Sequence, residues 1–336
     1  MDTEARHGSA GARPSGGGLG AISGPSERRM SAVDAVLLIA FGAPTAPEEI
    51  RPFLQLVSRG RRISPERLEE VAHHYERMPG GRSPLNELTD RQADGLRQAL
   101  TGAGLHLPVF VGMRNWHPFL RETLAAMASA GHRLGFAIIL SPFRSEASWE
   151  RYMKDVAGAR QEVADAPEVT FAPPWGEHPA FAVAAADCVR TALEKVPAAE
   201  RGEAAVVFTA HSIPRTMAAA SPYVDDFTAA ARAVAGRLGL ARWTLAYQSR
   251  SGGAGDPWLE PDIGHVVQQL AASGTRHVVV MPLGFVCDHV EVLYDLDIEA
   301  RALAAEHGLA FHRASAVNDH PQFVAMLADL VQRACA

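Results

Sequence analysis

Short apolar runs alternate with amphipathic stretches along most of the chain. Eight such runs stand out, at residues 36–41, 109–113, 137–140, 169–172, 205–210, 244–249, 278–283 and 310–314. Several of them are apolar throughout instead of at every second position, which is typical of strands that are covered on both faces. The pattern therefore predicts parallel strands that are joined by crossover helices.

The stretches between these runs carry helix signals. Thr89 and Gln92 have the spacing of a capping box, and an apolar stripe follows them over residues 93–100. Pro118 stands where the first residue of a helix would lie, and Gly131 is placed to end that helix. We predict a helix at each of these two places.

The runs divide into two groups of four around the proline-rich segment APPWGEHPAF. This division predicts an α/β protein with two Rossmann-like domains, each a four-stranded parallel sheet flanked by helices, over residues 32–175 and 176–336. The boundary is expected within 173–180. Residues 1–31 are rich in Gly, Ser, Ala, Pro and Arg and have no apolar period, so we predict a disordered tail there.

Composition narrows the class of protein. The chain has 336 residues, 47% of them hydrophobic, and a formal net charge of −6, which argues against a nucleic-acid partner. No apolar run approaches the roughly 20 residues of a transmembrane helix, and no secretory signal is present, so a cytoplasmic location without a transmembrane segment is expected. Its cysteines, Cys188, Cys287 and Cys335, have no paired spacing and predict no disulfide framework.

Candidate chemistry lies at the predicted strand ends, because open α/β sheets bind ligands beyond the carboxyl ends of their strands. Polar residues gather there in the segments 114–118, 211–214, 248–252 and 284–291. The common nucleotide, esterase and zinc-protease motifs are absent from these segments. The site is therefore not expected to be centred on a phosphate group.

His211 directly follows a buried run, so its imidazole is expected at the edge of the sheet. A lone histidine in such a place is more often a core or capping residue. Glu291, Asp295 and Glu299 are four residues apart and form one carboxylate column along a helix. Like charges at this spacing repel, so the column is either a solvated face or a cation site, and a π-bulge would align it better than a regular α-helix.

Considered together, His211 and Glu291 offer one nitrogen and one oxygen ligand. Such a mixed pair suits a first-row divalent metal ion. Two protein ligands leave coordination positions open, as a site must if the ion is to be passed on. The residues thus predict a labile divalent-metal site, without naming the metal.

Seven segments spread along the chain resemble the ferrochelatase family. They are IAFGAP (39–44), GGRSPL (80–85), MRNWHP (113–118), FTAHSIP (208–214), QSRSG (248–252), DPWLEPD (256–262) and GFVCDHVEVLYDLD (284–297). Their order and spacing also match, so the resemblance covers residues 33–333. It implies an enzyme that inserts Fe²⁺, as substrate, into a porphyrin in haem biosynthesis.

The resemblance also implies roles for individual residues. His211 and Glu291 take the places of the catalytic and iron-binding residues, with Asp295 and Glu299 as a relay toward solvent. Five residues of the first half are expected to contact the porphyrin, namely Phe41, Arg59, His74, Tyr75 and Ser83. Phe41 has no ligating atom, so position 41 supplies no axial phenolate. Arg59 and its neighbours Arg61 and Arg62 are as readily explained as a solvated basic loop.

The substrate that the resemblance favours is coproporphyrin III, because IAFGAP, MRNWHP and QSRSG look most like the actinobacterial branch. Its four propionates need basic partners, for which Arg59, Arg61, Arg62 and Arg114 are candidates. No tightly bound cofactor is expected, and three cysteines are too few for the four-cysteine iron–sulfur cluster of some relatives. A monomer is expected. Protoporphyrin IX as substrate, a sirohydrochlorin chelatase for cobalt or nickel, and a non-catalytic haem or porphyrin carrier remain as alternatives.

Overall fold

The computed structural model describes residues 33–60, 63–251 and 257–336. The predicted tail at 1–31, the candidate rim residues Arg61 and Arg62, and positions 252–256 lie outside the described residues. The described residues form one compact unit.

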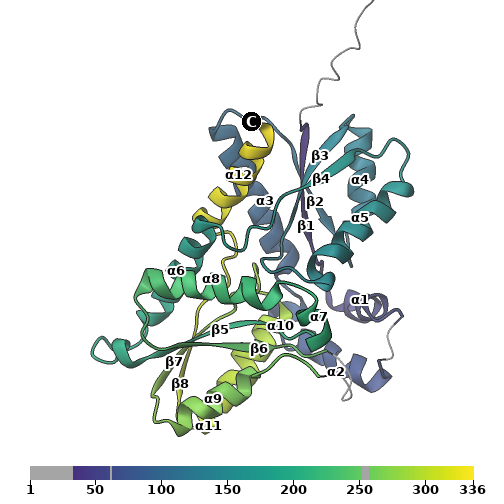
Figure 1. Ribbon diagram of the computed structural model, residues 1–336. Helices are drawn as coiled ribbons and strands as arrows, with labels where there is room; N and C mark the ends of the chain where they lie inside the picture. Colours follow the sequence, from purple (N-terminus) through teal and green to yellow (C-terminus); the bar gives the residue numbers. More distant parts are fainter. Residues whose placement is uncertain (1–32, 61–62, 252–256) are drawn as a thin grey trace, which may run out of the picture. The chain divides into compact units, whose positions relative to one another are not determined.

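The first four strands form one parallel sheet (Figure 1). Its order is β2 (Val109–Met113), β1 (Ala35–Ala40), β3 (Leu134–Ile139) and β4 (Glu168–Phe171). Every residue of the inner strand β1 is buried, as its unbroken apolar run predicts for a strand that is covered on both faces.

The last four strands form a second parallel sheet with the same order of connection. It runs β6 (Trp243–Gln248), β5 (Ala205–His211), β7 (His277–Met281) and β8 (Ala310–Arg313). The predicted α/β class with two four-stranded parallel sheets is confirmed, and all eight predicted runs are strands. Each sheet comes from one side of residue 175, whereas the division into two domains stays a prediction.

Helices flank both sheets. In the first half they are α1 (Ile50–Val57), α2 (Pro65–Glu76), α3 (Leu85–Gly102), α4 (Leu120–Ser129) and α5 (Arg151–Gln161). The second half has α6 (Pro179–Leu193), α7 (Arg215–Ala219), α8 (Tyr223–Leu238), α9 (Ile263–Ala272), α10 (Val290–Val292), α11 (Arg301–Glu306) and α12 (Pro321–Cys335). None of the helices in the described part of the chain is long and apolar enough to cross a membrane.

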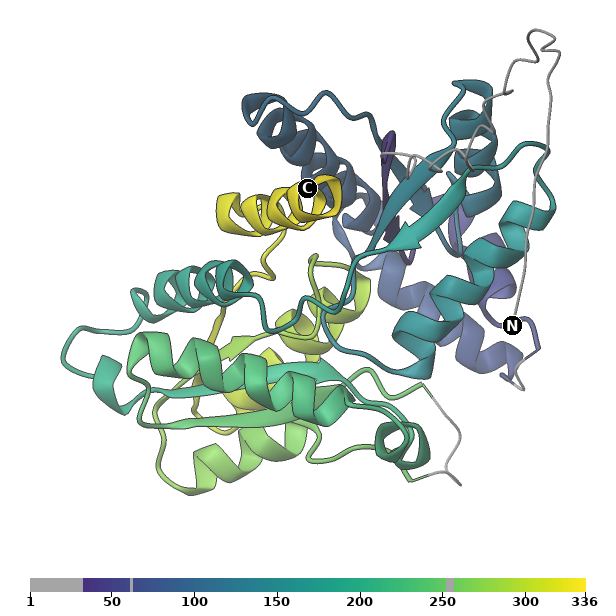
Figure 2. The same cartoon turned by 45° about the horizontal axis from the view of Figure 1, so that its top comes forward.

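The last helix, α12, packs against α3 of the first half as well as against α6, and Figure 2 shows this yellow helix beside both. Its apolar face is fully buried at Phe323, Met326 and Leu327. The end of the chain thus helps to cover a helix of the first sheet.

Two predicted helix starts are wrong. α3 begins at Leu85, four residues before Thr89, because the apolar stripe extends back to buried Leu85 and Leu88. The Thr89 hydroxyl lies inside the helix and donates to the Leu85 carbonyl at 2.8 Å. Pro118 belongs to the turn before α4, where its carbonyl accepts from Met113 N. Gly131 follows the end of α4 with a φ of +83°, as predicted.

Candidate metal centre

His211 is the last residue of β5, and 29% of its side chain is exposed. Its Nδ1 lies 2.5 Å from the carbonyl oxygen of Ser212. A carbonyl oxygen can only accept, so Nδ1 carries the hydrogen and Nε2 is the nitrogen that can take a proton or a metal ion. The hydroxyl of Tyr223 donates to the His211 carbonyl at 2.9 Å and fixes the backbone there.

Glu291 comes to His211 from the neighbouring strand, since it follows the turn after β7. Its Oε2 lies 3.9 Å from His211 Nε2. An ion bonded at about 2.1 Å to each of two ligand atoms can join atoms up to about 4.2 Å apart. A single first-row divalent ion therefore fits between these two side chains, which the sequence predicted as a pair.

The carboxylates of the column have unusual acidities. The Glu291 side chain is 48% exposed to solvent. The surrounding protein nevertheless displaces much of the water around the carboxyl group, and this desolvation raises the pKa of Glu291 to about 7. Desolvation also raises the pKa of Asp295 to about 7. A hydrogen bond from Ser249 lowers this pKa, but its effect is smaller than that of desolvation. Desolvation raises the pKa of Glu299 as well. With pKa values of about 7, Glu291 and Asp295 exchange protons readily near neutral pH, which suits a site that takes up cations.

A π-helix carries Asp295 and Glu299 of the column, and Glu291 lies in α10 just before it. Residues Leu293–Ala300 have this wider turn between α10 and α11, as the four-residue spacing of the carboxylates indicated. Leu296 and Ala300 are buried beneath it. The wider turn places residues four apart almost above one another, so Glu291, Asp295 and Glu299 line one side of the helix.

Two neighbours of this centre, Ser249 and His289, are not indicated by any sequence pattern. Ser249 follows β6 with a φ of +61°, and its hydroxyl donates to Asp295. His289 caps α10 by accepting at Nδ1 from the backbone N–H of Glu291 at 3.2 Å, and burial lowers its pKa to about 4. Both lie in segments that resemble the family, but no sequence signal indicates which atoms they contact.

Two of the predicted porphyrin contacts, His74 and Tyr75, pack against the segment that carries Glu291 and Asp295, and a third, Phe41, has an exposed ring. Phe41, just beyond β1, is 44% exposed. His74 on α2 stacks on Tyr294 of the π-helix, with ring centroids 3.5 Å apart and 9° between the ring planes, so one face of its ring is already covered. Tyr75 is buried in one apolar cluster with Val290, which precedes Glu291.

The other basic and polar candidates lie in different surroundings. Arg59 is exposed in the turn after α1. Ser83 is buried, and its hydroxyl accepts from Leu85 N at 3.4 Å. Arg114 pairs with Asp155 and lies over the Tyr152 ring at 5.2 Å. Their predicted porphyrin contacts stay predictions.

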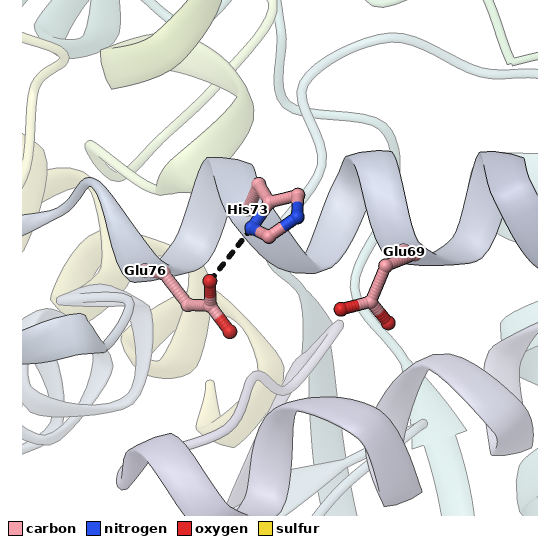
Figure 3. A group of neighbouring side chains, drawn as sticks. All are labelled: Glu69, His73 and Glu76. Carbon is pink, nitrogen blue, oxygen red and sulfur yellow. Dashed lines mark hydrogen bonds and ion pairs between the residues drawn. The ribbon is translucent and has the colours of Figure 1, made fainter.

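A second group of metal-ligand types lies on the exposed surface of α2. Glu69, His73 and Glu76 have ligand atoms within 4.8 Å of one another (Figure 3). Arg51 of α1 pairs with Glu69 and also with Glu76, the latter at 3.1 Å, and His73 Nδ1 lies 2.8 Å from Glu76. Because an arginine already neutralises both carboxylates, this group is better explained as an ion-pair network between α1 and α2.

Comparison with solved structures defines the fold class. The sirohydrochlorin chelatase of Bacillus subtilis subspecies spizizenii, solved with cobalt, has a TM-score of 0.54 at 11% identity, over 90% of this chain and 95% of that chain. A multi-domain protein of Deinococcus radiodurans with structural similarity to chelatases has a TM-score of 0.56 at 15% identity, over 90% of this chain and 55% of that chain. At these identities the likeness shows the fold alone, which is that of the chelatases.

Sequence comparison defines the family. The model of the ferrochelatase family matches residues 33–335. The coproporphyrin III ferrochelatases of Mycolicibacterium smegmatis and Nocardia farcinica are 42% and 43% identical, over 89% and 90% of this chain and 88% of each relative. The ferrochelatase of Rhodopirellula baltica is 39% identical over 89% of this chain and 85% of its own. The chain belongs to the ferrochelatase family, and the resemblance seen in its motifs is confirmed.

Proposed function

We propose that the protein is an enzyme of haem biosynthesis that inserts Fe²⁺ into coproporphyrin III to give iron-coproporphyrin III. The observation that carries the proposal is the pairing of His211 Nε2 with Glu291 Oε2 at 3.9 Å, a nitrogen and an oxygen ligand from two neighbouring strand ends. The names of the relatives that are 42% and 43% identical support coproporphyrin III as the substrate.

Insertion exchanges two pyrrole protons for one ferrous ion. His211 is suited to take a proton at Nε2, because its Nδ1 is committed to the Ser212 carbonyl. Glu291, with its pKa raised to about 7, holds the ion as a carboxylate and accepts a proton once the ion has moved into the ring. We assign both residues to metal binding and proton transfer.

The remaining carboxylates of the column extend this path. Asp295 of the π-helix follows Glu291 of α10 by four residues, and the exposed Glu299 follows Asp295 by four more. The succession of three carboxylates at four-residue spacing supports a relay in which hydrated iron or protons pass along the column. Desolvation raises the pKa of Asp295 to about 7, so Asp295 can gain and lose a proton near neutral pH, and it raises the pKa of Glu299 as well.

The porphyrin is proposed to lie beside Phe41, whose exposed ring offers an apolar surface to the macrocycle. His74, Tyr75, Ser83 and Arg59 are the other proposed contacts. Binding energy over the apolar face of the ring would bend it out of plane and expose its nitrogen lone pairs to the ion.

The proposal is tested by measuring ferrous insertion into coproporphyrin III and protoporphyrin IX under anaerobic conditions. Faster insertion into coproporphyrin III is expected, whereas a preference for protoporphyrin IX would correct the substrate. Insertion of cobalt or nickel into sirohydrochlorin in place of either reaction would favour the related chelatase class. Porphyrin binding without any insertion would indicate a carrier.

The protein is further proposed to work without a tightly bound cofactor, as a cytoplasmic monomer. Its sequence has three cysteines, of which Cys188 and Cys287 are buried, so it lacks the four thiolates of the cluster in some relatives. Iron and sulfide analysis of the purified protein and its sedimentation velocity test these two points.

A further inference from the structure

Arg313, at the end of β8, contacts two carboxylates at once. Its Nη1 donates to Asp288 Oδ1 at 2.6 Å, and its Nε lies 2.7 Å from Asp297 Oδ2. Only 15% of the Arg313 side chain and 13% of that of Asp288 are exposed. The guanidinium is therefore a mostly buried bridge, and ion pairs of this kind are costly to break because each leaves an unpaired buried charge.

The two carboxylates lie on either side of the metal-binding residues in the sequence. Asp288 is in the turn that leads into α10, three residues before Glu291. Asp297 is in the π-helix, two residues after Asp295. Through them Arg313 holds both ends of the segment that carries Glu291 and Asp295.

The turn that contains Asp288 is further fastened to the segment after β8. Asp288 accepts from Ala316 N at 3.2 Å and from Asn318 Nδ2 at 3.0 Å. Its own backbone N–H donates to Asn318 Oδ1 at 2.8 Å. These three bonds, two of them accepted by the Asp288 carboxylate, tie the approach to Glu291 to the segment after β8.

The helix itself needs such support. A π-helix is rare and is retained where surrounding contacts stabilise it, and carboxylates four residues apart repel one another. A buried cation that is bonded to the same helix offsets part of this repulsion. Lysine could not replace it fully, because its three N–H donors share one nitrogen, whereas the guanidinium reaches the two carboxylates with different nitrogens.

We propose that Arg313 is a positioning residue for iron insertion, and that its simultaneous contact with Asp288 and Asp297 sets the place of Glu291 relative to His211. The inference rests on the proposed function of the His211 and Glu291 pair. Within the described part of the chain, the Arg313 guanidinium bonds to Asp288, Asp297 and the Ala314 carbonyl, so it acts through the loop and helix that it holds.

The test compares Arg313→Gln and Arg313→Lys with Arg301→Gln as the matched control. Arg301 also pairs with Asp297, at 2.9 Å, but its side chain is 47% exposed and it follows Asp297 by one helical turn. Rates of anaerobic insertion are measured with Fe²⁺ and coproporphyrin III varied separately, together with the melting temperature of each variant.

Arg313→Gln is expected to lower kcat/KM for Fe²⁺ by about tenfold or more, the usual size of effects from residues that orient metal ligands. Its KM for coproporphyrin III should stay within about twofold of the wild type, since a uniform loss of binding is not expected. Arg313→Lys should fall between Arg313→Gln and the wild type, because it keeps the charge but contacts one carboxylate. Arg301→Gln should resemble the wild type.

Wild-type kinetics separate this inference from the function on which it rests. If the wild type inserts no iron, the proposed function is wrong. If the wild type is active and both Arg313 variants match it, or Arg301→Gln loses as much, the positioning role is wrong. Should Arg313→Gln fail to fold, Arg313→Lys and Asp297→Asn decide, and unchanged kinetics for Fe²⁺ in both would overturn the inference.

Discussion

At the scale of single residues, environment sets the chemistry of the candidate metal centre. Desolvation raises the pKa values of Glu291 and Asp295 to about 7, well above the ordinary values of these carboxyl groups. His211 owes its ligand nitrogen to one hydrogen bond, from Nδ1 to the Ser212 carbonyl. The same side chains in open solvent would neither hold protons at neutral pH nor present a fixed lone pair.

The raised pKa of Glu291 predicts how the stability of the metal-free protein depends on pH. A carboxyl group whose pKa is about 7 when folded, against an ordinary value near 4.5, favours the folded state below pH 4.5. This contribution is lost as pH rises through 7, because folding must then desolvate a charge. Glu291→Gln has no charge to desolvate at high pH, so this variant does not lose stability in this way. The variant should melt at a higher temperature than the wild type at pH 8, and the difference should shrink toward pH 4.

Differential scanning calorimetry of the metal-free proteins checks this prediction, with Glu48→Gln as the control at an exposed position. The control should shift the melting temperature equally little at both pH values. A Glu291→Gln variant that melts below the wild type at pH 8 would show that the carboxylate is stabilised in the fold instead of desolvated.

The sequence indicated His211 and Glu291 because both signals are local. One is a polar residue directly after an apolar run, and the other is a charge repeated every four positions. No sequence pattern indicates Ser249 or His289. Ser249 lies in a turn with positive φ, and His289 accepts a capping hydrogen bond from the backbone of Glu291. Such features depend on the conformation of the folded chain, which composition and spacing do not specify.

At the scale of elements, the π-helix Leu293–Ala300 links the metal centre to the first half of the chain. Its Tyr294 stacks on His74 of α2 and lies beneath Arg77, whose guanidinium carbon is 5.5 Å from the ring centroid. The helix that carries Asp295 is therefore braced by α2 as well as by its own sheet.

Tyr294→Ala should lower the free energy of unfolding by about 2 kcal/mol, because it removes a stacked ring and the apolar contacts of its side chain. Tyr294→Phe is the matched control. It keeps the ring and loses only a long contact of 3.5 Å between Arg77 and the hydroxyl, so its stability should stay near that of the wild type. Urea denaturation measures both, and equal losses would mean that the hydroxyl, and not the ring, is the important group.

Strands were easier to predict than helix starts. An apolar run that is buried on both faces has a clear beginning and end, and all eight runs became strands. The starts of α3 and α4 were misplaced because Thr89 and Pro118 fit the local capping rules. At α3 packing outweighed this signal, since buried Leu85 extends the apolar stripe back. At α4 a different local cap holds the start, because Glu122 accepts from the backbone N–H of Phe119.

At the scale of the whole molecule, contacts between the two halves of the chain could not be predicted. Gln92 on α3 is fully buried, and its amide Nε2 donates to the carbonyls of Asn318 at 2.8 Å and Val286 at 3.4 Å. These acceptors belong to the segments that support the acid-bearing helix. Nothing in the chemistry of a glutamine in an amphipathic helix indicates a partner more than two hundred positions away.

Gln92→Ala should lower the free energy of unfolding by about 2 to 3 kcal/mol, because buried carbonyls lose their donor and a cavity remains. Arg91→Ala is the matched control, because Arg91 immediately precedes Gln92 in the same helix. Arg91 pairs with Asp319 at 2.7 Å, but 54% of its side chain is exposed, so its loss should cost about 1 kcal/mol or less. Similar losses in the two variants, measured by urea denaturation, would contradict this account of the contact.

The most direct test of the central claim is the anaerobic rate of Fe²⁺ insertion into coproporphyrin III by the wild type and by His211→Ala, with porphyrin binding followed in parallel by fluorescence quenching. The account predicts that His211→Ala abolishes insertion while its affinity for coproporphyrin III stays close to that of the wild type. Turnover retained in that variant would contradict the assignment of His211 and Glu291 as the iron-binding pair.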